Sequence, residues 1–201
     1  MAYQRAEFRS SFGKVITVVI GLLMAAAVVS IVLAGDPETS LRLLPWPLLG
    51  AALTWLLMWR PRVVVDTSGV EVVNPFTTWD IPWGSIRRID TKWALELETD
   101  RGTVQAFAAP APSRYGIASI TRDDIRLARE SSLIGGAIRP GDSIQSGSGA
   151  AAHVTRTHWE ELRDEGRLDE THAGASRRVH WPSVAVAAVP AALVLAGTLL
   201  P

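Results

Sequence analysis

The sequence predicts a membrane protein of the α+β class, with an N-terminal transmembrane helical hairpin, an antiparallel β-module with a following helix, and a C-terminal transmembrane helix. Two observations support this prediction. Apolar runs without an ionisable residue occupy residues 15–34, 43–59 and 183–200, and a helix needs about 20 such residues to cross a hydrocarbon core of about 30 Å. Residues 60–132 instead contain short segments of alternating apolar and polar side chains, which indicate a sheet with one buried face.

Composition excludes several classes of function. The formal net charge of the 201 residues is zero, so the basic footprint of a nucleic-acid-binding protein is missing. The lack of cysteine excludes disulfides, thiol catalysis and cysteine-ligated zinc. No ionisable residue lies within a predicted span, although transporters usually need one there. We expect no nucleic-acid partner, no cofactor, no metal site and no transport activity.

Residues 1–14 are polar and basic, and we expect them to form an N-terminal arm before the first span at residues 15–34. A secretory signal peptide is the alternative, because Val32-Leu33-Ala34 resembles a cleavage site. The apolar region of a signal peptide has about 7 to 15 residues. The run here is longer, which favours a retained helix.

A short acidic loop is expected at residues 35–42, and the second span follows at residues 43–59. This run is short, so a re-entrant or interfacial helix is the alternative. Five basic residues flank the hairpin and one lies in its loop, which places the loop outside the cell and the β-module in the cytoplasm. The flanking residues are Arg5, Arg9, Lys14, Arg60 and Arg62, and the loop residue is Arg42.

The β-module reads as an antiparallel meander of about six strands. The inward positions are expected to be Val63, Val65, Val70, Val72, Trp93, Leu95, Leu97, Val104, Ala106 and Ala108. Turn residues separate the strands at 67–69, 74–75 and 100–102. A tight corner is expected at Gly84, within Ile81-Pro82-Trp83-Gly84-Ser85-Ile86.

The order of valine strand, Ser-Gly turn, second strand, Ile-Pro-Trp-x-x-Ile and Asp-x-Gly hairpin resembles a known family over residues 60–110. It is similar to the small pleckstrin-homology (PH)-like domains of actinobacterial membrane proteins, the group named after low molecular weight protein antigen 6. The resemblance implies a seven-stranded barrel closed by a helix. The seventh strand would lie at residues 115–120 or be absent, and residues 122–131 are expected to form the closing helix.

The C-terminal third is predicted to contain a flexible linker at residues 133–150, a helix at residues 151–168 and a third span at residues 183–200. Glycine, serine and proline dominate the linker. Gly166 is expected to cap the helix in the left-handed conformation. For the alanine-rich last run, a hydrophobic tail docked on another protein is the alternative to a span.

Three sets of residues are candidates for binding. Trp159 and Leu162 share one face of a polar helix; we favour packing back on the meander, and a partner-binding anchor is the alternative. Ala188, Ala192 and Ala196 form a row that permits close helix contacts in lipid, although chance also produces such rows in alanine-rich chains. The resemblance suggests headgroup recognition, for which Arg87 and Arg88 could hold a lipid phosphate; a solvated strand edge is the simpler interpretation.

No pattern of an activated nucleophile or phosphate-binding loop is present, so we expect a non-catalytic protein. The sequence favours a multi-pass plasma-membrane protein that presents its PH-like module in the cytoplasm, with the C-terminus outside. The expected partners are membrane lipids and another membrane or envelope protein, as for an accessory subunit or scaffold. Recognition of a lipid headgroup is the alternative function.

Overall fold

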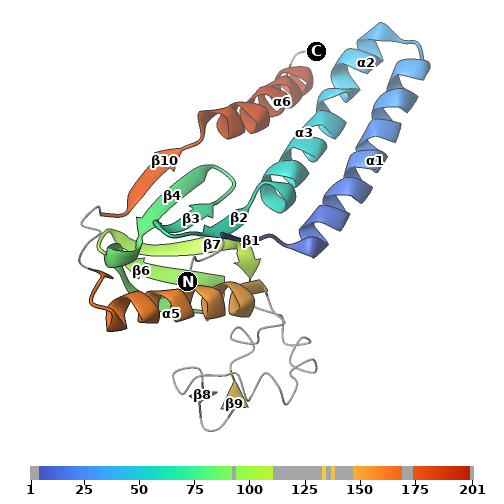
Figure 1. The fold of residues 1–201 in the computed structure, drawn as a ribbon. Coiled ribbons are helices and arrows are strands. Elements are labelled where there is room, and N and C mark those ends of the chain that lie inside the picture. Colours follow the sequence, from blue (N-terminus) through green and yellow to red (C-terminus); the bar gives the residue numbers. More distant parts are fainter. Residues whose placement is uncertain are drawn as a thin grey trace. The chain divides into compact units, whose positions relative to one another are not determined.

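The structure is a computed structural model that describes residues 5–91, 94–110, 133–134, 137–138, 147–168 and 174–199. The chain divides into two compact units, both drawn in Figure 1. Residues 1–9 and 61–178 belong to the sheet domain, and residues 10–60 and 179–201 belong to the helical unit. The chain therefore passes between the two units three times.

The helical unit holds three helical runs, Ser11–Leu33, Pro37–Trp59 and Trp181–Leu199, that are long and apolar enough to cross a membrane. They contain almost all of the three predicted apolar segments, which confirms these as candidate spans by length and composition. The elements are α1 (Ser11–Leu33), α2 (Pro37–Leu43), α3 (Pro45–Thr54), the π-helical turn η1 (Trp55–Trp59) and α6 (Trp181–Leu199).

The predicted loop at residues 35–42 was wrong, because most of it is helix α2. Asp36 is the N-cap and its Oδ2 accepts a hydrogen bond from the Thr39 amide at 3.0 Å. Pro37 follows at the first helical position, where a missing amide donor costs nothing. The Asp-Pro pair is thus a helix start here, although such pairs also favour turns.

Close helix packing in this unit involves Gly13 and Gly50, which lie outside the alanine row of the last span. A Cβ on Gly13 would lie 2.6 Å from the carbonyl oxygen of Met58, and one on Gly50 would lie 3.0 Å from Met24 Sδ. A Cβ on Gly21 would meet nothing within 4 Å. Helix α3 contacts both α1 and α6, so the small residues at its contacts allow the helices to approach closely.

The sheet domain contains a five-stranded sheet in the order β1-β2-β3-β4-β10 and a three-stranded sheet in the order β5-β6-β7 (Figure 1). The strands are β1 (Ala6–Phe8), β2 (Arg62–Val65), β3 (Gly69–Val73), β4 (Thr77–Pro82), β5 (Ile86–Asp90), β6 (Ala94–Thr99), β7 (Gly102–Pro110) and β10 (Ser176–Val179). Strands β2 to β7 confirm the six predicted strands, but the predicted meander is divided between the two sheets, with β2 to β4 in one and β5 to β7 in the other. A 3₁₀ turn at Trp83–Ser85 forms the predicted corner between the two sheets.

The N-terminal arm predicted at residues 1–14 instead contains regular structure. Strand β1 pairs antiparallel with β2, and helix α1 begins at Ser11. Phe8 lies opposite Val63 and packs against the core. The C-terminal strand β10 occupies the other edge, beside β4. Ala6–Phe8 has only three residues and Ser176–Val179 has a single apolar residue, so neither segment gives a period-2 signal and sequence analysis missed both.

The inward face of both sheets forms the core, as predicted. Trp83 is 1% exposed, its Nε1 donates to the Asp66 carbonyl at 3.1 Å, and its ring meets His158 edge-on at 4.8 Å between centroids. Helix α5 (Gly147–Asp164) covers this core with the fully buried Ala151, Ala152 and Thr155. The buried strand residues include Val63, Val65, Val70, Val72, Ile81, Leu95, Leu97, Val104, Ala106 and Ala108.

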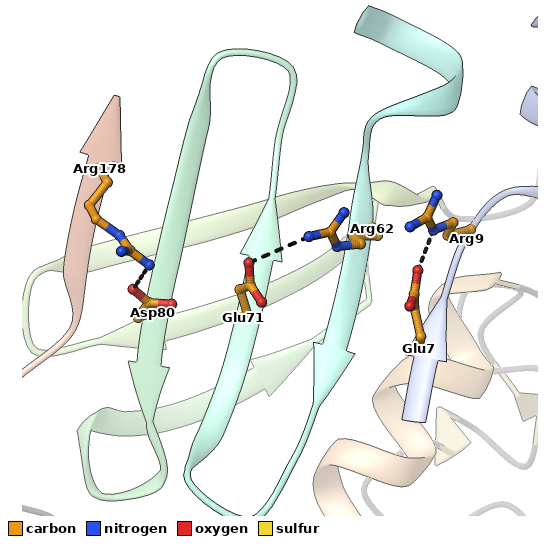
Figure 2. Close-up of polar contacts among 6 residues, drawn as sticks. All are labelled: Glu7, Arg9, Arg62, Glu71, Asp80 and Arg178. Carbon is orange, nitrogen blue, oxygen red and sulfur yellow. Dashed lines mark hydrogen bonds and ion pairs between the residues drawn. The ribbon is translucent and has the colours of Figure 1, made fainter. Parts of the chain in front are cut away.

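The outer face of the five-stranded sheet carries a row of ion pairs, shown in Figure 2. Glu71 lies directly opposite Asp80 across β3 and β4, a like-charge contact that destabilises a sheet. Basic residues offset it, since Arg62 pairs with Glu71 at 3.9 Å and Arg178 pairs with Asp80 at 2.6 Å. Glu7 and Arg9 pair in the same row. Both edge strands thus contribute to one balanced charged surface.

The region after β7 differs from the prediction where the structure describes it. The predicted linker at residues 133–150 contains a two-stranded hairpin of β8 (Leu133–Ile134) and β9 (Ala137–Ile138), and α5 already begins at Gly147. Gly166 has φ +68°, which confirms the predicted left-handed cap. The predicted strand at 115–120 and helix at 122–131 lie outside the described residues, as does Trp93.

The five-stranded sheet has two distinct ends. At one end, which we call the helix-joined end, β1 leads into α1, β2 follows η1 and β10 leads into α6. Arg62 lies opposite Val73 there, so the β3–β4 turn at 74–76 belongs to the same end. Figure 2 shows β10 antiparallel to β4, consistent with this assignment. The far end holds the turn at 66–68, the corner Trp83–Ser85 and the β6–β7 turn, whose Asp100 amide donates to the Ser85 carbonyl at 3.3 Å.

Candidate binding site between β5 and α5

A hollow of about 180 Å³ lies between strand β5 and helix α5 in the sheet domain. Three of its lining residues are arginines, whereas only one is acidic. The complete lining is Arg87, Arg88 and Ile89 from β5, and Arg156, Trp159 and Glu160 from α5. The predicted pair Arg87 and Arg88 is therefore brought together with a third guanidinium group from 68 positions later in the chain, counting from Arg88 to Arg156.

A β-bulge explains how neighbouring residues of one strand can line the same hollow. Ile86 pairs with Thr99 and Arg88 pairs with Glu98, so Arg87 is an extra residue without an opposite partner in the ladder. Successive side chains of a regular strand point to opposite faces. A bulge breaks this alternation and redirects a side chain. The local irregularity thus places both arginines at the hollow.

Helix α5 is held beside β5 by two hydrogen bonds from long side chains to strand carbonyls. Trp159 Nε1 donates to the Ile86 carbonyl at 3.2 Å, and an Arg156 guanidinium nitrogen donates to the Ile89 carbonyl at 3.1 Å. Both acceptors belong to the strand that carries the bulge. The hollow therefore has one wall on each element and a polar connection between the walls.

The charges at the hollow suit an anionic group. Arg88 and Asp90 form an ion pair with a long N···O distance of 3.5 Å, and the Arg88 side chain is 62% exposed. Such an exposed ion pair contributes little free energy. Arg87 is exposed, and the described part of the chain offers it no hydrogen bond or ion pair. Guanidinium groups bind carboxylates and phosphates through strong, often bidentate hydrogen bonds. The arrangement can therefore bind an anion without first breaking a strong internal pair at Arg87.

The first hairpin turn, where the family resemblance would suggest phosphate recognition, is acidic. Partial burial raises the pKa of Asp66, but the Ser68 hydroxyl and the Ser68 and Gly69 amides donate to its carboxylate and lower that pKa below its ordinary value overall. The Asp66 carboxylate is thus held in its ionised form. A negative charge in this turn opposes phosphate binding there.

The other candidate residues are placed differently from one another. Trp159 and Leu162 are partly buried and pack against the core, which is the alternative that we favoured for them. Ala188, Ala192 and Ala196 are exposed on α6, whereas Ser183, Pro190 and Val194 of the same helix are buried. The alanine row is thus free of packing within the described helical unit.

Arg156 is the site residue that sequence analysis missed. It lies three positions before Trp159, a spacing that places two residues on the same face of a helix. This signal was available in the sequence, because the helix and the inward-facing Trp159 were both predicted. What could not be read from the sequence was which strand that face would meet.

Residues 60–133 match the family model described as Bacterial PH domain. The chain carries a PH-like domain. The predicted resemblance is confirmed at this level, while its actinobacterial subgroup stays a prediction. We use the name PH-like domain for the whole sheet domain, although the match does not extend to β1, α5 or β10. No curated protein and no solved structure gave a match.

Proposed function

We propose that this is a non-catalytic membrane protein that holds its PH-like domain at the inner membrane face and uses the Arg87–Arg88–Arg156 hollow to bind an acidic segment of another protein. Three spans anchor the domain, and the excess of basic residues flanking the hairpin orients it toward the cytoplasm. The single observation that carries the proposal is the convergence of three arginines on one hollow.

The size of the hollow supports a contact role over a catalytic one. Small-molecule and cofactor sites usually enclose about 300–1,000 Å³, whereas this hollow has about 180 Å³. It can take one or two carboxylate side chains that project from a larger partner. Trp159 adds an aromatic surface beside the arginines, and Trp and Arg are the residue types most enriched at the energetic centres of protein interfaces.

The position of the hollow favours a protein ligand over a lipid headgroup. Arg87 and Arg88 follow the far-end corner Trp83–Ser85 directly. The sheet between the two ends is about 17 Å long, since β3 has five residues at about 3.3 Å each. A partner in the cytoplasm can reach such a site without competition from the bilayer. Recognition of a lipid phosphate is the second candidate, because guanidinium groups bind phosphate equally well.

The proposal can be tested with the full-length protein in nanodiscs of zwitterionic lipid. We expect a fluorescent oligo-glutamate peptide to bind in an anisotropy titration. Arg87→Gln and Arg88→Gln should each weaken binding about 10-fold or more, because a hydrogen bond to a charged group contributes about 1.5–3 kcal/mol. Arg101→Gln is the matched control, since Arg101 is an exposed far-end arginine outside the hollow.

Two outcomes would contradict this function. Equal affinity of all four proteins would show that the peptide does not use the hollow. Binding of a water-soluble glycerophosphoglycerol headgroup, sensitive to Arg87→Gln but without any binding of the peptide, would replace the protein ligand with a lipid phosphate. A stoichiometric partner that copurifies in mild detergent with the wild type and with Arg101→Gln, but not with Arg87→Gln, would supply the natural ligand.

A further inference from the structure

Two phenylalanines stand out on the surface of the PH-like domain. Phe76 is 39% exposed and Phe107 is 50% exposed, and among the described residues of this domain they are the exposed large aromatic side chains. We call them the phenylalanine patch. Single exposed apolar residues are ordinary, so what matters is whether the two lie together and where.

The side chain of Asn74 connects the two parts of the patch. Its Nδ2 donates to the Gln105 carbonyl at 2.9 Å, and its Oδ1 accepts from the Phe107 amide at 2.9 Å. Its own amide donates to the Thr77 carbonyl at 2.8 Å and closes the turn that carries Phe76. The turn and strand β7 are thus fixed to each other, and both phenylalanines belong to one rigid region.

Phe107 is not explained by core packing. Val104, Ala106 and Ala108 of β7 are buried and form the inward row. Phe107 belongs to the outward row, with the exposed Thr103 and Gln105. Phe107 keeps half of its surface in contact with water, so packing within the domain accounts for only part of this phenylalanine.

The patch lies at the helix-joined end of the sheet. The β3–β4 turn follows Val73, which pairs with Arg62, the first residue of β2. Two residues separate β1 from α1, two separate η1 from β2, and one separates β10 from α6. Two intervening residues leave three steps from the last strand residue to the first helix residue, or the reverse, and these span at most about 11 Å. Three apolar helical runs thus start or stop within about 11 Å of the strand ends at this end.

We propose that the phenylalanine patch inserts into the headgroup region of the bilayer and fixes the helix-joined end of the PH-like domain to the lipid surface. The occupant of the patch is the membrane itself, because chain connectivity delivers this end to the lipid wherever the three helices span. Aromatic side chains partition favourably into the membrane interface. This inference is independent of the arginine hollow, which lies at the far end.

The absence of cysteine from the chain makes the test direct. Phe76→Cys and Phe107→Cys are each labelled with an environment-sensitive nitrobenzoxadiazole fluorophore in the full-length protein, with one copy in each nanodisc. The matched controls are Thr67→Cys in the exposed far-end turn and Thr103→Cys on the outward row of β7. Lipids that carry a nitroxide near the headgroup serve as the quencher.

We expect the labels at positions 76 and 107 to be blue-shifted and quenched by the nitroxide lipid several-fold more strongly than the label at position 67. The label at position 103 should fall between these values. Equal quenching at all four positions would overturn the proposal. Protection from an aqueous quencher without lipid quenching would also overturn it, because a protein would then cover the patch. Unfolding curves in detergent verify that each labelled variant is folded.

Discussion

The two ends of the PH-like domain expose different chemistry. The helix-joined end carries Phe76 and Phe107, connected through Asn74. The far end carries the acidic turn of Asp66 and, immediately after the corner at Trp83–Ser85, the arginines of the hollow. This separation is the basis of our two proposals, that the helix-joined end contacts lipid and that the far end binds an acidic ligand.

The largest expected effect comes from replacing one aromatic residue at each end of the domain and comparing the changes in the free energy of unfolding. Trp83→Ala should lower the free energy of unfolding by about 3–5 kcal/mol, because Trp83 is buried in the core and its removal leaves a large cavity. Phe76→Ala should change it by about 0.5 kcal/mol or less, since an exposed side chain in detergent solution has little packing to lose. Denaturant unfolding of the full-length protein in detergent measures both. Similar losses would mean that Phe76 belongs to the folding core and that the patch is structural.

A smaller effect is expected at the connection between α5 and β5. Trp159→Phe keeps most of the apolar contact but removes the Nε1 hydrogen bond to Ile86, which should lower the free energy of unfolding by about 0.5–1.5 kcal/mol. Faster amide exchange in α5 should accompany this loss, together with weaker oligo-glutamate binding. Trp181→Phe is the control, because Trp181 is 72% exposed and outside the PH-like domain. Unchanged exchange in α5 would show that the tryptophan does not hold the wall of the hollow.

The smallest expected effect concerns pH at the far end. Because the folded pKa of Asp66 is lowered, its ionised form stabilises the fold at pH values above the unfolded pKa of about 3.9. That contribution is lost as the pH falls through the lower folded pKa. A carboxyl carbon NMR titration should place Asp66 below its ordinary pKa, and unfolding curves of Asp66→Asn should lack this part of the acid dependence. An ordinary pKa in the wild type would show that the hydrogen bonds from Ser68 and Gly69 do not stabilise the ionised carboxylate.

Sequence analysis predicted the local elements of the domain more fully than its assembly. The inward Val70 and Val72 of β3 were correct because they flank the polar Glu71 with period-2 spacing. Short strands at both ends of the chain were missed, since the three residues of β1 show no period. The bulge at Arg87 was also missed, because nothing in Ile86-Arg87-Arg88 distinguishes an irregular strand from a regular one.

Only two of the three arginines at the candidate site were predicted from the sequence. Arg87 and Arg88 were chosen as a pair from their charge, whereas Arg156 was not, although a helix with Trp159 on its apolar face was expected. The glycine at 166 and its left-handed cap were correct because only a local backbone requirement was involved. Residues that act together across two elements need a tertiary contact before they can be recognised as a group.

The sequence by itself determined the three apolar helical runs, the six strands β2 to β7 and the balance of charge, because each depends on neighbouring residues in one segment. Only the tertiary structure decided that β1 and β10 complete the sheet and that Trp159 and Arg156 reach the carbonyls of Ile86 and Ile89, contacts that join residues 73 and 67 positions apart. Such pairings depend on how whole elements pack, and no local pattern encodes them. The opposition of an apolar end and a charged end is a product of that packing.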